Sequence, residues 1–155
     1  MLRLNRSSKA KAGIAKFAIV ASEYNSEYVN AMVKAAKAEL NRAGARPVQI
    51  FRVPGAFEIP VVAARVARLS QHAAIICLGV ILRGETVHAA QIGEAVSRAL
   101  MEIQLRYEVP VIHEVLLLEN EGQARVRCLG KKHNRGSEAA QTALTMAGVM
   151  GRLSS

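Results

Sequence analysis

Gly79-Val80-Ile81-Leu82-Arg83-Gly84-Glu85-Thr86-Val87-His88 is the stretch from which the fold of this chain can be derived. It continues an apolar run, Ala73 to Leu78, which is typical of a strand buried on both faces. The chain then changes direction at Arg83-Gly84, because glycine can adopt backbone angles that other residues avoid. Behind this turn Thr86 can cap a helix, with His88 in its first turn.

A strand, a glycine turn and a helix start bring several backbone N–H groups to one point, which suits an anion. The imidazole of His88 would lie within about one helical turn of that point. The pattern therefore indicates proton transfer beside a bound phosphate. The alternative is an ordinary βα loop with a solvated histidine.

The composition is that of an ordinary globular protein, with 51% hydrophobic and 21% charged residues among 155. No apolar run approaches the roughly 20 residues that span a bilayer, and the charged N-terminus lacks the apolar segment of a secretory signal. We therefore expect a cytoplasmic protein with no membrane contact. Cys77 and Cys128 have no metal or redox spacing, so we expect both to be reduced and packed.

The formal net charge of +9 is partly concentrated in residues 1–15, which we expect to be a flexible basic arm. The other cations are spread over predicted helix faces without interleaved aromatic residues, and we expect no specific nucleic-acid binding. Residues 16–155 form one predicted domain. The cations in the arm are Arg3, Arg6, Lys9 and Lys11.

Strands alternate with helices along the chain, which predicts βαβ units. The predicted strands are 16–22, 47–53, 73–82 and 109–118. The first predicted helix runs from its cap Ser26 to Gly44, a short helix ends near Arg68, and a third runs from its cap Thr86 to about Tyr107. A short helix lies between its cap Asn120 and Gly130, and the last helix follows Gly136. Ser26 is expected to cap the first helix and Gly44 to end it. The fold class is therefore α/β, a three-layer α/β/α sandwich with a four-stranded parallel sheet.

Ligands of such sheets bind beyond the carboxyl ends of the strands, and three unusual segments fall there. Tyr24 could stack on a planar ligand or simply pack, and Asn25 could bind a ligand hydroxyl, although stabilising the turn is its commoner role. Glu58 could accept hydrogen bonds from a polyol, or be a first-turn carboxylate worth about 0.3–1 kcal/mol. Convergence of these segments with Gly84 to His88 is the main functional prediction.

The remaining candidates are weaker. Arg127 could bind phosphate or be a solvated helix arginine. His72, His113 and His133 lack metal-ligand spacing with one another or with His88, so we predict no metal site. No serine or cysteine lies in a nucleophile elbow.

Two long motifs carry a resemblance to a known family. They are Val53-Pro54-Gly55-Ala56-Phe57-Glu58-Ile59-Pro60 and the stretch from Gly79 to His88, followed by Glu119-Asn120, Gln123-Ala124, Arg127 and Asn134-Arg135-Gly136. From Phe17 to about Arg152 the chain resembles the lumazine synthases, which catalyse the penultimate step of riboflavin biosynthesis. The resemblance implies a flavodoxin-like sheet.

It also implies a transferase without cofactor or metal, which condenses 5-amino-6-(D-ribitylamino)uracil with 3,4-dihydroxy-2-butanone 4-phosphate. The products would be 6,7-dimethyl-8-ribityllumazine, phosphate and water. The resemblance implies that His88 and Arg127 are catalytic. The substrate-binding set would be Tyr24, Asn25, Gly55, Ala56, Phe57, Glu58, Val80, Ile81, Leu82, Gly84, Glu85, Thr86, His113 and Arg127.

Within this set, the resemblance implies that Tyr24 stacks on the pyrimidine and that Asn25, Ala56 and Glu58 line the ribityl chain. Ile81 and Leu82 would touch the pyrimidine edge, and residues 84–86 would bind the phosphate. His88 would move protons. Arg127 would reach the phosphate from a neighbouring subunit, so the site would exist only in a homo-pentamer.

The same resemblance implies an icosahedral shell of pentamers, because the turn Gly130–Gly136 carries no insertion, and riboflavin synthase as a candidate partner. Three positions depart from the family pattern. His113 stands where an apolar residue, usually phenylalanine, covers the ligand ring; Arg135 replaces a lysine; Ala89 follows His88 where an aromatic residue is common. The other function classes left open are a flavin-binding or sensing protein, a mainly structural shell subunit and an unrelated flavodoxin-like module.

Overall fold

The computed structural model describes residues 15–45, 47–85 and 87–154. Its strands are β1 (Phe17–Ser22), β2 (Val48–Val53), β3 (Ala74–Leu82) and β4 (Val111–Leu118). The helices are α1 (Ser26–Arg42), α2 (Ile59–Arg68), α3 (Ala89–Tyr107), α4 (Glu121–Ala124) and α5 (Arg135–Leu153). Short turns η1 (Ala56–Glu58) and η2 (Arg83–Glu85) and the π-helical segment η3 (Arg125–Leu129) complete the order.

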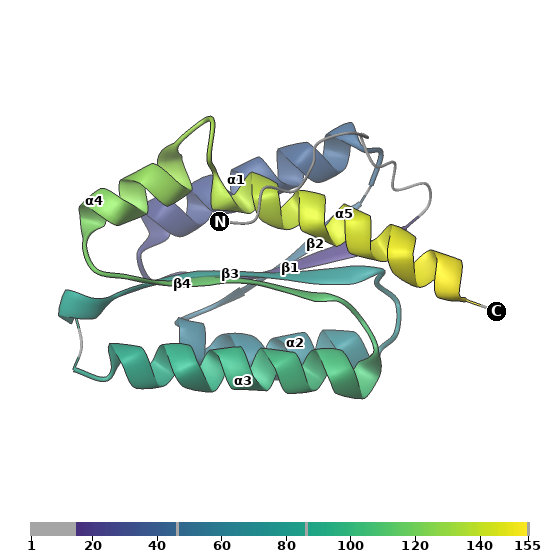
Figure 1. Cartoon of the computed structure of the whole chain (residues 1–155), viewed down its shortest axis with the longest axis horizontal. Helices are drawn as coiled ribbons and strands as arrows, with labels where there is room; N and C mark the ends of the chain where they lie inside the picture. The colour runs from purple at the N-terminus through teal and green to yellow at the C-terminus, as the bar shows by residue number, and fades with distance from the viewer. Residues whose placement is uncertain (1–14, 46, 86, 155) are drawn as a thin grey trace.

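The four strands form one parallel sheet in the order β2-β1-β3-β4. Helices α2 and α3 cover one face, and α1, α5 and η3 cover the other (Figure 1). Two buried apolar clusters fill the spaces between these layers. The predicted three-layer α/β/α fold with a flavodoxin-like strand order is confirmed.

The central strands explain the apolar run in the sequence. Every residue of β1 and of β3 is buried, because helices cover both faces and neighbouring strands cover both edges. The edge strands β2 and β4 contain exposed positions. The two most apolar strands in the sequence are therefore the central strands of the sheet, and the two strands with charged positions are its edges.

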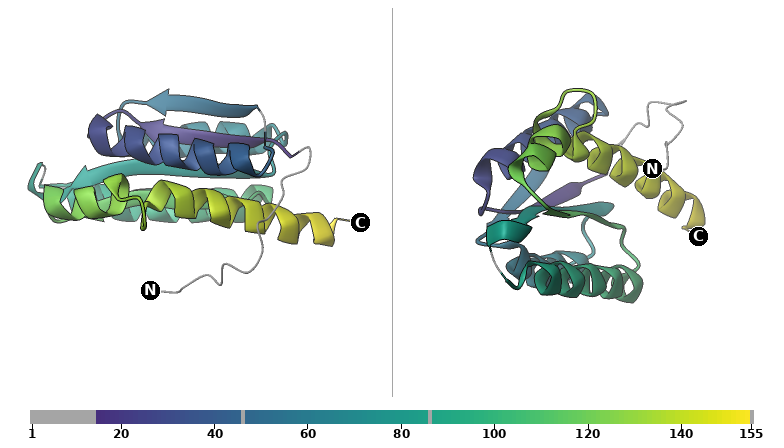
Figure 2. Two further views of the ribbon diagram at one scale, coloured as in Figure 1. Left: turned by 90° about the horizontal axis from the view of Figure 1, so that it is seen from above. Right: turned by 60° about the vertical axis from the view of Figure 1, so that its left-hand side comes forward.

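Helices α1 and α5 lie side by side over their face of the sheet (Figure 2). The two helices approach each other closely at Gly136, where an added Cβ would lie 2.1 Å from the carbonyl oxygen of Met32. Only glycine fits there. The Asn134 side chain caps α5 by accepting from the backbone N–H groups of Gly136 (2.7 Å) and Ser137 (3.3 Å).

Several predicted boundaries need correction. The first helix begins at Ser26, so its N-cap is Asn25, which adopts the left-handed conformation with φ 58°. The second strand begins at Val48 and the fourth at Val111, one and two residues later than expected. Gly44, with φ 88°, follows the α1 C-cap as predicted.

Other expectations concern residues near the chain ends and the cysteines. The predicted arm lies outside the described residues except for residue 15, and Thr86 also lies outside them. Cys77 and Cys128 are both buried free thiols, as predicted. No helix in the described part of the chain is long and apolar enough to cross a membrane.

Candidate functional site

The carboxyl ends of all four strands meet at one edge of the sheet, as the parallel register requires. The Asn25 amide Nδ2 donates to the carbonyl oxygen of Val80 at 2.8 Å and so ties the end of β1 to β3. The backbone N–H of Tyr24 donates to Pro54 O at 3.0 Å, which ties it to the loop after β2. Asn25 therefore stabilises this turn, which is the commoner of the two roles open to it.

Tyr24 forms an aromatic platform at this edge. Its residue surface is 66% exposed, and its ring lies directly against Gly55. A Cβ at Gly55 would be 2.9 Å from both Cδ2 and Cε2 of Tyr24, closer than carbon atoms approach. The glycine of this motif is therefore needed so that the ring can lie on the backbone.

The residues after Gly55 continue around the same edge. Ala56 is buried, Phe57 is 65% exposed and Glu58 is half-buried. The Glu58 carboxylate oxygen Oε2 lies 3.6 Å from the position that a Gly55 Cβ would take, which places it beside the Tyr24 ring. Glu58 occupies the N-cap position of α2 but its side chain makes no capping hydrogen bond, so its carboxylate is not used to begin that helix.

The predicted contacts on β3 are largely packed into the protein. Val80, Ile81 and Leu82 are 3%, 7% and 6% exposed. Val80 and Leu82 face the α1–α5 layer, and Ile81 faces the α2–α3 layer. Within one chain these residues can therefore meet a ligand mainly through backbone groups and the tips of their side chains.

The turn after β3 differs from its prediction in one respect. Gly84 lies in the 3₁₀ turn η2 and does not adopt a left-handed conformation; Gly44 is the one described glycine that does. An added Cβ at Gly84 would meet no heavy atom within 4 Å. The change of direction therefore does not depend on glycine. Glu85 ends η2, and Thr86 lies outside the described residues.

His88 is exposed and occupies the N-cap position of α3, not its first turn as expected. Its ring atom Nδ1 lies 3.0 Å from Gln91 Oε1, and its backbone carbonyl accepts from Ile92 N at 3.0 Å. The imidazole is thus fixed by its own helix at the edge where β3 ends. Its neighbour Ala89 is 1% exposed and packs in the core between α3 and the sheet.

An open hollow of about 570 Å³ lies beside this site, at the ends of β3 and β4. An ion pair between Arg83 Nε and Glu119 Oε1, 3.1 Å apart, joins these two strand ends. Among the predicted substrate contacts that the structure describes, Leu82 and Gly84 line this hollow. Its other lining residues are Glu119, Asn120, Glu121, Gly122 and Arg125.

Two predicted site residues lie away from His88 in the same chain. Arg127 is in η3, which packs with the α1–α5 layer, whereas His88 begins a helix of the opposite layer. His113 is the third residue of β4, about 17 Å from the carboxyl end of that strand at about 3.3 Å per residue. One chain alone therefore does not assemble the whole predicted set.

Sequence reasoning missed the contacts of two polar side chains. Ser97 Oγ lies 2.7 Å from His113 Nε2, and Glu119 pairs with Arg83 across the sheet edge. The separation of Ser97 and Glu119 from their partners in sequence hides both contacts. Only the register of β3 against β4 and the packing of α3 on β4 bring them together.

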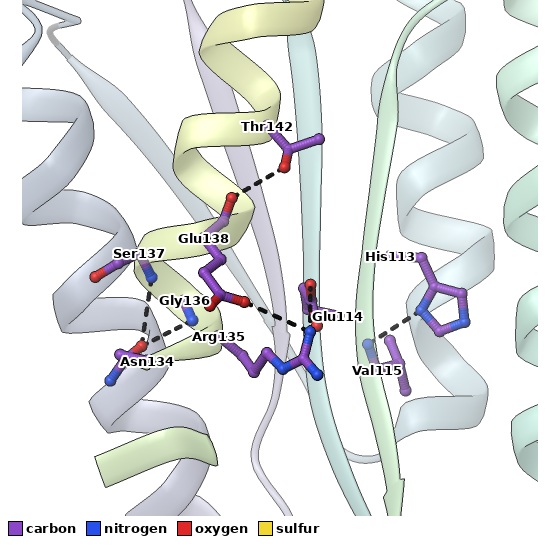
Figure 3. Close-up of polar contacts among 9 residues, drawn as sticks. All are labelled: His113, Glu114, Val115, Asn134, Arg135, Gly136, Ser137, Glu138 and Thr142. Atoms are coloured by element: carbon purple, nitrogen blue, oxygen red, sulfur yellow. Dashed lines mark hydrogen bonds and ion pairs between the residues drawn. The ribbon is translucent and has the colours of Figure 1, made fainter. Parts of the chain in front are cut away.

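A second polar cluster lies between β4 and α5, on the face of β4 opposite to the one that carries His113 (Figure 3). Arg135 Nη1 lies 4.0 Å from Glu114 Oε1 and 3.5 Å from Glu138 Oε2. Burial raises the pKa of Glu114 to about 7, against the opposing effect of Arg135.

Burial likewise raises the pKa of Cys128 to about 11, so this thiol is protonated at neutral pH. Within the described ranges, no group of three or more His, Cys, Asp or Glu side chains could hold a metal ion.

The fold and the site together define a flavodoxin-like α/β protein whose candidate ligand site lies at the carboxyl edge of the sheet. The model of the 6,7-dimethyl-8-ribityllumazine synthase family matches residues 14–151. The chain belongs to this family, and the predicted resemblance is confirmed.

Curated relatives carry the same name. The chain is 41% identical over 138 residues to the 6,7-dimethyl-8-ribityllumazine synthase of Xanthomonas oryzae pv. oryzae, covering 88% of this chain and 90% of the relative. It is 38% identical over 141 residues to that of Stenotrophomonas maltophilia, covering 90% of this chain and 91% of the relative.

Proposed function

We propose that this chain is a transferase that condenses 5-amino-6-(D-ribitylamino)uracil with 3,4-dihydroxy-2-butanone 4-phosphate. The products are 6,7-dimethyl-8-ribityllumazine, phosphate and water, in the penultimate step of riboflavin biosynthesis. Family membership supports this reaction. The observation that carries it at the level of residues is the convergence of Tyr24, Glu58 and His88 at one edge of the sheet.

The binding roles of Tyr24 and Glu58 follow from the position of their side chains at that edge. The Tyr24 ring stacks on the pyrimidine, because it is exposed and lies against Gly55. The Glu58 carboxylate, beside that ring, accepts hydrogen bonds from the ribityl hydroxyls. Asn25 and Ala56 complete the ribityl side, while Ile81 and Leu82 contact the pyrimidine edge.

His88 handles the protons of the reaction. Imine formation, loss of phosphate and ring closure each move a proton, and a positioned acid–base group contributes about 10²–10⁴-fold. The remaining acceleration comes from holding two substrates in reacting geometry. Backbone N–H groups of residues 84–86 and an arginine stabilise the departing phosphate.

That arginine is Arg127 of a neighbouring subunit, and His113 of the same neighbour covers the ligand ring. The separation of both residues from His88 within one chain supports this arrangement. The site is then shared between adjacent subunits of a homo-pentamer. Pentamers pack further into an icosahedral shell, with riboflavin synthase as a candidate partner and the cytoplasm as the location.

A direct assay tests the activity. Purified protein is mixed with both substrates, and lumazine fluorescence is followed together with release of inorganic phosphate. We expect lumazine and phosphate in equal amounts. A protein that binds ribityl ligands but forms no lumazine would overturn the proposed reaction and favour a flavin-binding role.

A further inference from the structure

The outer edge of β4 is covered by side chains. Pro110 O accepts from Ile75 N at 2.9 Å, so alternate backbone groups of β4 face β3 and those of Val111, His113 and Val115 face outward. Val111 N donates to Gln104 Oε1 at 2.9 Å. Val115 N donates to His113 Nδ1 at 3.1 Å, as Figure 3 shows. The imidazole of His113 is therefore hydrogen-bonded through Nδ1 to the backbone at the edge of the sheet.

Three hydrogen bonds determine where the proton of His113 lies. Val115 N–H can only donate, so Nδ1 must accept and carries no proton. The neutral ring is then protonated at Nε2, which lies 2.7 Å from Ser97 Oγ. Ser97 donates its own proton to Gly93 O at 2.8 Å, which leaves its oxygen free to accept from Nε2–H. These three hydrogen bonds together select the Nε2–H tautomer of His113.

The surroundings favour the uncharged ring. Burial lowers the pKa of His113 below its ordinary value. Its register partner on β3 is Cys77, a thiol that stays neutral because burial raises its pKa to about 12. On α3, Glu94 lies about one turn before Ser97 and Arg98 directly follows it, and these two side chains pair with each other at 3.1 Å. Protonating Nδ1 would also break the bond from Val115 N.

We propose that Ser97 is a positioning residue for the reaction: its hydroxyl holds His113 as the neutral Nε2–H tautomer with the ring plane fixed, so that one flat, uncharged face meets the substrate ring in the neighbouring subunit. This inference rests on the shared site proposed above. Both hydrogen bonds are made by the ring nitrogens and neither uses the π face of the imidazole, which leaves that face for stacking. Ser97 thereby lets a histidine act as a flat, uncharged surface.

The tautomer is measured directly by solid-state ¹⁵N NMR of the assembled, histidine-labelled protein, with the His113 signals identified by their loss in His113→Phe. At pH 7 we expect an unprotonated Nδ1 and a protonated Nε2. Ser97→Ala should give a mixture of tautomers and a higher pH of protonation. Ser97→Thr, which keeps a hydroxyl at the same position, should restore the single tautomer.

The consequence for the substrate is measured by kinetics. Ser97→Ala should raise KM for the ribitylaminouracil about fivefold, as expected for loss of one hydrogen bond, while kcat changes less. The increase should be larger at pH 6 than at pH 8, and Ser97→Thr should reverse it. In the His113→Phe background, Ser97→Ala should have no further effect on KM.

Two results would overturn the inference: a protonated Nδ1 in the unmutated protein, or an equal rise in KM from Ser97→Ala with and without His113→Phe. The second result would mean that Ser97 acts only through the stability of α3. If the protein forms no lumazine at all, the proposed function fails, but the NMR result still decides whether Ser97 fixes the tautomer.

Discussion

At the scale of single residues, His88 is the group on which the proposed chemistry depends. His88→Ala removes the proton-transfer group but leaves Tyr24 and Glu58 in place, so turnover should fall at least about 10²-fold. Affinity for a ribityl product analogue should change by less than about 1.4 kcal/mol, a factor of ten. Steady-state kinetics and fluorescence titration measure the two quantities.

The exposed His133 provides a matched control for that experiment. It lies in the turn before α5, outside the proposed site, so His133→Ala should alter neither quantity. Equal losses of turnover and affinity in His88→Ala would mean that His88 only binds.

The sequence predicted the position of some site residues but not the contacts of others, and the difference has a physical reason. Tyr24, Glu58 and His88 lie in the short segments that follow β1, β2 and β3, and the parallel sheet brings strand ends together wherever the exact boundaries lie. The tautomer of His113 depends instead on a contact with Ser97, which only the packing of α3 on β4 creates. The left-handed turn at Asn25 was missed because its amide is held by Val80, a residue 55 positions away.

At the scale of elements, the contact between α1 and α5 depends on Gly136. In Gly136→Ala, the new Cβ would lie 2.1 Å from Met32 O and 2.6 Å from Met32 Cα, so α5 must move away from α1. We expect a loss of about 3 kcal/mol or more in the free energy of unfolding. Urea denaturation at fixed protein concentration measures it.

Gly151 in the same helix is the control, because an added Cβ there meets no heavy atom within 4 Å. Gly151→Ala should be neutral or stabilise the protein by up to about 1 kcal/mol, as alanine favours a helix. Similar losses from both substitutions would mean that the close approach of α1 and α5 does not limit stability.

The cluster between β4 and α5 predicts a dependence of stability on pH. Burial raises the pKa of Glu114 from 4.5 to about 7, with Arg135 opposing and Glu138 adding to the shift. Because the folded state binds this proton more tightly, the stabilisation is complete below about pH 4.5 and is lost as the pH rises through 7. The full change is about 3 kcal/mol.

Glu114→Gln should remove this contribution, so the variant gains stability relative to the unmutated protein between pH 5 and pH 8. Urea denaturation at several pH values measures the difference. Glu94→Gln, on the exposed face of α3, should give a curve parallel to that of the unmutated protein. A parallel curve for Glu114→Gln would show that its carboxyl titrates alike in the folded and unfolded chains.

At the scale of the whole molecule, the helix layers separate His88 from Arg127, and this predicts complementation between subunits. Arg127→Ala should raise KM for the butanone phosphate and leave ribityl affinity nearly unchanged. When Arg127→Ala and His88→Ala subunits mix at random in equal amounts, about one quarter of the shared sites contain both intact residues. Activity should recover to that fraction. Exchange of subunits without recovery would place both residues in sites formed by one chain.

The last prediction concerns assembly beyond the proposed pentamer. The family resemblance predicts no insertion in the turn before α5. The last turns of α5 extend beyond α1 and the sheet (Figures 1 and 2). Ala140, Ala143 and Leu144 are buried against the chain's own core, whereas Leu153 at the free end is 73% exposed. In the proposed shell, the apolar side chain at this projecting end would be covered by a neighbouring pentamer.

Charge opposes this contact. Each chain carries a formal charge of +9, which accumulates in a closed shell and is screened only when the Debye length falls to about 10 Å or less near 0.1 M salt. We therefore expect hollow icosahedral particles at moderate ionic strength and dissociation toward pentamers at low salt. Mass photometry across a salt and phosphate series measures this equilibrium. Isolated pentamers under every condition would show that the exposed end of α5 does not join pentamers together.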